Sequence, residues 1–126
     1  MARLRSIMLL MLDVPRTANF FREGLGCKVV MADDSFAEVQ TGEVNIMLKS
    51  VQSIAESTKG YSPFLNFEVD DIDGAISRLI YHGGSLDGPI KYPAHGKVAA
   101  VQAPCGHMIS LFEPNSDLLT LQSRLK

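Results

Sequence analysis

The chain has no tryptophan, only two cysteines and three histidines, and aromatic residues make up only 7% of its 126 positions. Its apolar runs are short: the one over 7–12 is far below the roughly 20 residues that cross a bilayer. Neither sign of charge dominates, because 12 Lys and Arg residues stand against 14 Asp and Glu residues, for a formal net charge of -2. Proteins that bind nucleic acid usually carry a basic face or stripe. We therefore expect neither a membrane span nor a nucleic-acid partner.

The two cysteines, Cys27 and Cys105, lie 78 residues apart and have no metal-binding spacing. Two free thiols in a reducing cytoplasm are the simplest interpretation, and a disulfide has no support. Apolar residues make up 46% of the chain and charged residues 21%, which is typical of one globular domain. A chain of this length buries roughly two thirds of its unfolded surface, so it needs no metal or disulfide merely to fold. We expect a cytoplasmic protein with a single domain over 1–126.

Apolar periodicity predicts the same order of elements twice. In the first half a helix is expected from Pro15 to Leu25, with strands over 5–12, 28–31, 36–40 and 44–48. In the second half a helix is expected over 71–81, with strands over 64–69, 85–90, 96–102 and 107–112. The first strand and helix of the two halves align at an offset of 58 residues, which places Asp13 on Asp71 and Gly26 on Gly84. Such self-similarity indicates an internal repeat.

This order predicts an α+β fold built from two βαβββ modules. The first module covers about 1–50, a linker covers 51–60, the second module covers about 61–114, and a C-terminal helix covers 115–126. Each module alone is about half the chain, which is too short to bury enough surface for a stable hydrophobic core of its own. The two modules are therefore expected to form one unit.

Alternation along the strands separates two faces of the predicted sheets. One face is uniformly apolar and is expected to pack under the helices: Ile7, Leu9, Met11, Ile46, Leu48, Leu65, Phe67, Val69, Ile109 and Leu111. The opposite face mixes amides, hydroxyls and charges with flexible Met and Phe side chains. A solvent-facing sheet would hold fewer Met and Phe residues, and a closed core would not hold Asn, Glu and Lys. A lined cavity accommodates both kinds, and the alternative is a partly buried dimer face.

Several short motifs, in order on this repeat, give the chain a family resemblance. They are the segment 13–21 (DVPRTANFF) followed by Leu25-Gly26, then 67–72 (FEVDDI), Gly88-Pro89, Gly96 and 103–111 (APCGHMISL). Over about residues 5–114 the chain resembles the vicinal oxygen chelate superfamily, which includes glyoxalase I, extradiol dioxygenases, fosfomycin-resistance enzymes and bleomycin-binding proteins. The resemblance implies two modules whose strands form a curled, mixed eight-stranded sheet, a cup that holds the active site.

The same resemblance identifies the positions that hold a metal ion in metal-using members. On this chain those positions are Ser6, Met47, Phe64 and Ser110. Divalent metals in such sites take imidazole and carboxylate ligands, and none of these side chains is a strong ligand. Nothing at these positions replaces a metal that would polarise a substrate oxygen. We therefore expect a metal-free protein with no cofactor, and we assign no catalytic residue.

The remaining reactive side chains are expected to be mainly structural. His82 ends a predicted helix and His107 follows Gly106 in a tight turn, so capping and turn geometry explain both. His95 stays open to a binding or acid–base role, because its loop lies close to the cup mouth in the family it resembles. Glu68 is a general base if it is desolvated in the cavity, or it pairs with Lys49, which has the same predicted face.

The sequence therefore predicts a protein that binds a hydrophobic or aromatic small molecule, an antibiotic or a metabolite, in the cup. The expected ligand-binding residues are Ser6, Met8, Asn45, Met47, Phe64, Asn66, Glu68, His95, Met108, Ser110 and Phe112. A homodimer is also expected, with apolar residues of the C-terminal segment at its interface. Two alternatives stay open: an enzyme (lyase, isomerase or dioxygenase) with non-standard active-site residues, and a module whose cup is filled by its own side chains.

Overall fold

A computed structural model of the chain describes residues 2–30 and 33–115. Its elements follow the predicted order, strand, helix and three strands, twice. The helices are α1 (Val14–Asn19), which continues into a π-helical turn (Phe20–Gly24), and α2 (Ile72–Tyr81). The strands are β1 (Ser6–Met11), β2 (Lys28–Val30), β3 (Phe36–Gln40), β4 (Asn45–Ser50), β5 (Gly60–Glu68), β6 (Ser85–Lys91), β7 (Gly96–Gln102) and β8 (His107–Pro114). The prediction of an α+β fold with two βαβββ modules is confirmed.

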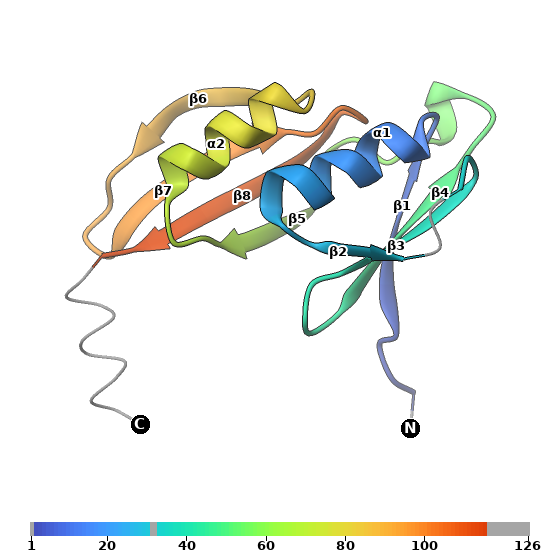
Figure 1. Ribbon diagram of the computed structural model, residues 1–126, viewed down its shortest axis with the longest axis horizontal. Coiled ribbons are helices and arrows are strands. Elements are labelled where there is room, and N and C mark those ends of the chain that lie inside the picture. Colours follow the sequence, from blue (N-terminus) through green and yellow to red (C-terminus); the bar gives the residue numbers. More distant parts are fainter. Residues whose placement is uncertain (1, 31–32, 116–126) are drawn as a thin grey trace.

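The eight strands are divided between two four-stranded sheets, one in each module (Figure 1). The strand orders are β1-β4-β3-β2 and β5-β8-β7-β6. Each sheet is mixed: its first strand pairs in parallel with its last, and the other pairs are antiparallel. The repeat seen in the sequence is thus a repeat of topology. The expected eight strands are present, as two sheets that are not closed into a barrel.

Both helices begin in the same way, and this explains why the repeat is strongest there. The Asp13 carboxylate accepts a hydrogen bond from the backbone N–H of Arg16 (3.1 Å), and Asp71 accepts one from Gly74 (3.2 Å). A side-chain oxygen at this position satisfies a backbone donor that the first turn of a helix leaves unpaired. Pro15 lies in the first turn of α1, where its missing N–H costs nothing.

The hydrophobic core lies between the helices and the sheets. The predicted apolar face is confirmed: six of its residues are buried, and Ile7, Leu65, Phe67 and Val69 pack against them half-buried. The two helices lie side by side over the sheets (Figure 1). They approach closely because Gly24 leaves room for Leu79 and Gly84 leaves room for Phe20. A Cβ atom at Gly84 would lie 2.7 Å from the Phe20 ring, so a side chain there would separate the modules.

Two boundaries differ from the sequence prediction. The linker contains a 3-10 turn (Ile54–Glu56), and β5 begins at Gly60, four residues before the expected strand. This early part of β5 is irregular, because its register against β8 shifts between Gly60 and Leu65, so alternation could not reveal it. The predicted C-terminal helix lies outside the described residues, apart from Asn115.

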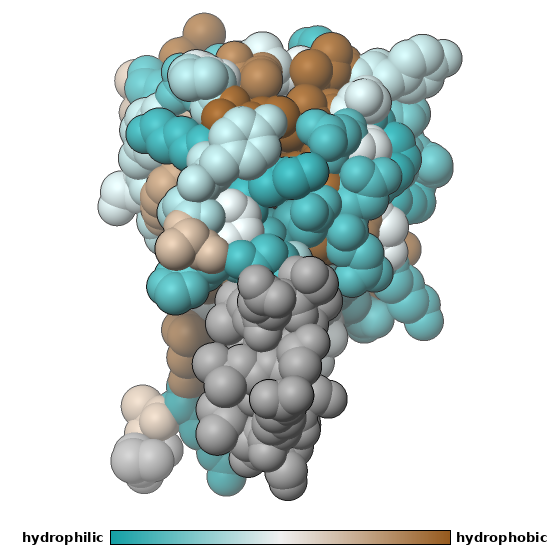
Figure 2. Space-filling view, turned by 90° about the vertical axis from the view of Figure 1, so that its left-hand side faces the viewer, coloured by the Kyte–Doolittle hydropathy of each residue, from teal (hydrophilic) through white to brown (hydrophobic). Residues whose placement is uncertain are grey.

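The side of the molecule formed by the second module is mainly polar. In Figure 2, polar side chains cover most of this side and hydrophobic ones gather towards its upper edge. Within the described part of the chain, no helix is long and apolar enough to cross a membrane.

Candidate functional site

The predicted binding residues fall into two groups, one on each sheet. On the first sheet, Ser6 lies opposite Asn45 and Met8 lies opposite Met47. On the second sheet, Asn66 lies opposite Ser110 and Glu68 lies opposite Phe112. Their strand neighbours on the other face are core residues, so both groups lie on the sheet faces that point away from the helices.

A polar contact that the sequence prediction missed organises the first group. The Asn45 amide donates a 2.7 Å hydrogen bond to the carboxylate of Glu38, which lies opposite Met47 on the neighbouring strand β3. Asn45 is therefore held by the protein itself. Alternation along β3, with Ala37 and Val39 buried, is the signal that would have placed Glu38 on this face.

The second sheet is strongly curled. β5 and β6 are its outer strands, yet the hydroxyl of Tyr61 on β5 donates a hydrogen bond to the carboxylate of Asp87 on β6. A bond between the two edges of one sheet requires the edges to bend towards each other over the concave face. We call this contact the Tyr61–Asp87 bridge.

A pocket of about 410 Å³ lies on one side of this bridge, over the concave face of the second sheet. We call it the cup pocket; Tyr61, Phe64, Asp87, Val98, Ala100 and Ser110 are among the residues that line it. The Phe64 ring is 49% exposed and makes an edge-to-face contact with the Tyr61 ring, with 5.2 Å between ring centres. Ser110 is buried at its floor. The cup pocket thus offers exposed aromatic surface beside the Ser110 hydroxyl, and Lys91 also lines it.

A larger pocket of about 710 Å³ lies on the other side of the bridge. We call it the seam pocket, because both modules line it: the start of α1, the linker, the first residues of β5 and β6, and the turn between β7 and β8. Of the predicted binding residues, it contains only Met108. Tyr61 and Asp87 line both pockets, so the bridge is the partition between them.

The other predicted residues lie outside both pockets. His95 is exposed in the loop between β6 and β7, where its carbonyl oxygen accepts a hydrogen bond from the backbone N–H of Asn115 (3.0 Å). Glu68 is exposed on β5, and the predicted pair with Lys49 is wrong. Lys49 lies on β4 of the other sheet, and the ion pairs among the described residues do not include it.

The four family metal positions do not fit a metal ion. Ser6 and Met47 lie on the first sheet, Phe64 and Ser110 on the second, and together they offer two hydroxyls, a thioether and a phenyl ring. Within residues 2–30 and 33–115, no three His, Cys, Asp or Glu side chains are grouped so that they could hold a metal.

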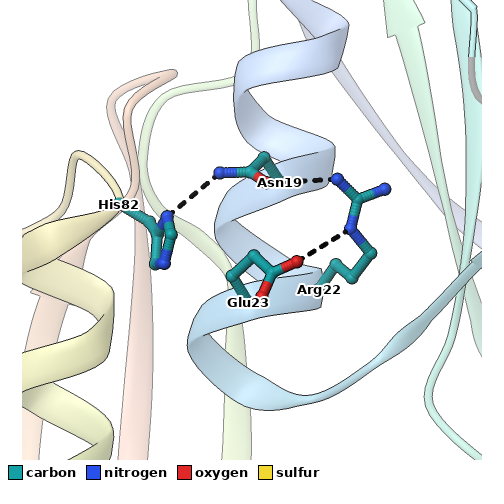
Figure 3. Close-up of polar contacts among 4 residues, drawn as sticks. All are labelled: Asn19, Arg22, Glu23 and His82. Atoms are coloured by element: carbon teal, nitrogen blue, oxygen red, sulfur yellow. Dashed lines mark hydrogen bonds and ion pairs between the residues drawn. The ribbon is translucent and has the colours of Figure 1, made fainter.

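Two of the histidines, His82 and His107, make side-chain hydrogen bonds within the protein. His82 caps the C-terminus of α2, and its Nδ1 atom lies 3.1 Å from the Asn19 amide nitrogen on the other module's helix. Figure 3 shows how this contact continues through Asn19 to Arg22 and Glu23. The expectation that His82 caps a helix is confirmed.

His107 is fully buried at the start of β8. Its Nε2 atom donates to the carbonyl oxygen of Pro63 (2.7 Å), while its Nδ1 atom has no hydrogen-bond partner among the described residues. Burial lowers the pKa of His107, because it disfavours the charged imidazolium, and the bond to Pro63 offsets part of this effect. Burial likewise raises the pKa of the Cys27 thiol, so Cys27 is a poor candidate nucleophile.

Paired βαβββ modules with a cup on the sheet face define the vicinal oxygen chelate class of proteins. The chain belongs to the Glyoxalase/Bleomycin resistance protein/Dioxygenase superfamily, whose sequence profile matches residues 3–111. No curated protein sequence matches it significantly.

Solved structures with the same fold include a binding protein and a resistance protein. A glyoxalase-related enzyme from Fulvimarina pelagi is 23% identical, with a TM-score of 0.72 over 90% of this chain and 88% of that one. The fosfomycin resistance protein FosX from Mesorhizobium loti is 19% identical, with a TM-score of 0.71 over 100% and 99%. The bleomycin-binding protein from Streptomyces verticillus, solved with copper(II)-bleomycin, is 18% identical, with a TM-score of 0.58 over 91% and 100%.

Proposed function

We propose that this protein binds a hydrophobic or aromatic small molecule in the cup pocket, without a metal ion and without turnover. The observation that carries the proposal is the exposed Phe64 ring in a pocket of about 410 Å³ that the chain leaves unfilled. A large apolar side chain that lines a concave surface is typical of a ligand site. A flat ligand would stack on Phe64 and would reach the Ser110 hydroxyl at the floor.

The composition of the site supports a binder over an enzyme of this superfamily. An enzyme needs a group that polarises the substrate or moves a proton. The cup pocket contains Phe64 and Ser110 where metal-using members have ligands, and its one carboxylate, Asp87, accepts the Tyr61 hydroxyl. Lys91 also lines the cup pocket, so a metal-free enzyme would depend on this amine, or on Glu68 or His95 outside the pocket.

A homodimer in the cytoplasm is part of the same proposal. Met8 on the first sheet and Phe64 on the second are each 49% exposed on faces that the helices do not cover. A second copy placed over these faces would bury apolar surface and complete the cups at or near the interface. The free thiols Cys27 and Cys105 fit a reducing compartment. Sedimentation equilibrium should then give twice the chain mass. A monomer's mass at every protein concentration over a 100-fold range would contradict the dimer.

The binding proposal is tested with a neutral aromatic probe, indole, and the variant Phe64→Ala. Indole should raise the melting temperature of the parent protein, because a ligand that binds only the folded state stabilises it. Phe64→Ala should weaken indole binding about fivefold or more in calorimetry and change the melting temperature little. Tyr92→Ala, which removes a 70% exposed aromatic ring outside both pockets, is the matched control and should bind indole as the parent does.

Two results would overturn the proposal. If Phe64→Ala lowers the melting temperature sharply, Phe64 is a core residue and the cup is filled by the chain itself. If the protein retains about one metal ion per chain after incubation with Zn, Ni, Fe(II) or Mn and desalting, the site is a metal centre and the enzyme alternative replaces the binder.

A further inference from the structure

The seam pocket is larger than the cup pocket and contains features that the proposed function does not use. It lies where two of the sequence motifs meet, the start of α1 and the turn over 103–106. Two cationic side chains, Arg16 from the first module and Lys59 from the linker, line it together with the half-buried thiol of Cys105. We propose that the seam pocket is a second binding site, which takes an organic anion: a carboxylate carried on an apolar body.

Arg16 is positioned by the second module. The point where a Cβ atom of Gly83 would lie is 3.3 Å from the Nε and Nη2 atoms of Arg16 and 3.1 Å from the Pro104 ring. The guanidinium group therefore occupies space that Gly83 leaves open, beside the turn that contains Cys105. No ion pair or side-chain hydrogen bond to another described residue engages this group, so its donors are available to a ligand.

Lys59 flanks the same turn from the other direction. Its Cβ atom is 3.5 Å from the position of a Cβ atom on Gly106, and the next residue, Gly60, donates a 3.0 Å backbone hydrogen bond to the Gly106 carbonyl. No ion pair of the described residues includes Lys59. The turn thus has Arg16 beside Pro104 and Lys59 beside Gly106, with Cys105 between these two contacts.

The carboxylates of the seam pocket are already engaged. Asp13 accepts the backbone N–H of Arg16 as the helix cap, and Asp87 accepts the Tyr61 hydroxyl. Both carboxylates keep their negative charge and balance the two cations, so an anion is favoured by the free donors of Arg16 and Lys59 and not by a net positive charge of the lining. An anion that enters the pocket finds donors that cost no rearrangement of existing bonds, and charge-assisted hydrogen bonds are stronger than neutral ones.

The rest of the pocket is apolar and explains why the ligand needs an apolar body. Three exposed aliphatic side chains of the structure meet here: Leu12 (50% exposed), Ile54 (63%) and Leu86 (37%). They come from three separate segments: the residue after β1, the linker and β6. Their convergence beside Arg16 and Lys59 makes a site with one apolar and one cationic side, which a simple inorganic anion would fill poorly.

The test uses 2-naphthoate as the probe and 2-naphthamide as its neutral counterpart of the same shape. Calorimetry on the full chain should show that naphthoate binds at least about tenfold more tightly than naphthamide. Raising the ionic strength should weaken the binding of naphthoate and leave the binding of naphthamide unchanged. Naphthoate should also slow the alkylation of Cys105 by iodoacetamide, measured by peptide mass, while Cys27 on the same chain, outside the pocket, should react at its original rate.

Three variants assign the binding to the seam pocket. Arg16→Gln and Lys59→Gln should each lower the affinity for naphthoate about five- to tenfold and leave the affinity for naphthamide unchanged. Lys28→Gln removes an exposed cation on β2, away from the pocket, and should bind naphthoate as the parent does. Equal binding of the two probes, or full affinity in both Arg16→Gln and Lys59→Gln, would overturn the anion site.

The Phe64→Ala variant separates this proposal from the cup proposal. It should keep naphthoate affinity and the protection of Cys105, because Phe64 lines only the cup pocket. If Phe64→Ala abolishes naphthoate binding while Arg16→Gln does not, naphthoate binds in the cup and the seam site is wrong. If indole binding fails but the Arg16 and Lys59 effects are found, the seam site stands and the cup proposal falls.

Discussion

The hydroxyl of Tyr61 donates a hydrogen bond to the carboxylate of Asp87, and this bond joins the two outer strands of the second sheet. Between these strands lie β8 and β7, which form the floor of the concave face. The bond therefore passes over the floor and separates the cup pocket from the seam pocket. One contact between sheet edges thus forms the boundary between the two pockets.

The first prediction concerns this bridge. Tyr61→Phe removes the hydroxyl and keeps the ring against Phe64, so it should lower the free energy of unfolding by only about 0.5–1 kcal/mol. The loss is small because Tyr61 and Asp87 are both exposed, and water replaces the lost partner. Urea unfolding measures it, with Tyr92→Phe as the control. A loss above about 3 kcal/mol would show that the bridge supports the fold itself.

The second prediction compares two glycines in β-strands: Gly96 begins β7, and Gly88 lies within β6, where the register against β7 shifts. A Cβ atom at Gly96 would overlap the backbone carbonyl oxygen of Glu113, which cannot move without disturbing β8. Gly96→Ala should therefore cost more than about 2 kcal/mol of unfolding free energy. Gly88 has a φ of +75° and open space around it, so Gly88→Ala should cost only about 1 kcal/mol. Equal losses in urea unfolding would contradict the assigned clash.

The third prediction concerns pH and His107. Its pKa in the folded protein is below the ordinary value of 6.5, because burial disfavours the imidazolium. Above pH 6.5 the imidazole is neutral in both the folded and the unfolded protein. Below pH 6.5 the unfolded chain binds the proton at a higher pH than the folded protein does. The free energy of unfolding should therefore fall as the pH drops below about 6.5, by at most about 1.4 kcal/mol per pH unit. The fall ends once the pH is below the folded-state pKa.

Substitution separates His107 from other sources of pH dependence. His107→Gln should lower stability at pH 8 but flatten the slope between pH 6.5 and 5, whereas His95→Gln, which changes an exposed loop residue, should keep the parent slope. The backbone amides of Ser35 and Phe36 lower the pKa of Asp33, so its contribution is lost only below about pH 4 and does not overlap this window. An unchanged slope in His107→Gln would refute the assignment.

The fourth prediction concerns the contact between the helices of the two modules (Figure 3). The Asn19 amide nitrogen lies 3.1 Å from His82 Nδ1, and this bond is half-buried. A double-mutant cycle with Asn19→Ala and His82→Ala should give a coupling free energy of about 0.5–1.5 kcal/mol. A second cycle with Glu23→Ala and His82→Ala, which have no direct bond between them, should give a coupling near zero. Equal coupling in both cycles would mean that the helices respond as a whole to any substitution.

The sequence by itself determined the order of elements and the two faces of each sheet. Alternation of Ile7, Leu9 and Met11 identified the buried face of β1, because successive strand residues point to opposite faces. The offset of 58 residues identified Asp13 and Asp71 as equivalent positions, and in the structure both carboxylates cap the start of a helix. These properties depend on neighbours along the chain, so a local pattern contains them.

Only the tertiary structure decided which of these residues meet. The predicted pair of Glu68 and Lys49 was wrong because a shared face does not place two residues on the same sheet. Tyr61 and Asp87 meet because a four-stranded sheet curls, and Arg16 and Lys59 reach one turn because the modules pack side by side. The curl of a sheet is the sum of small twists between neighbouring strands, and the packing of the modules depends on contacts between residues that are distant in the sequence. No local pattern of residues specifies those sums, so the two pockets became visible only in the folded molecule.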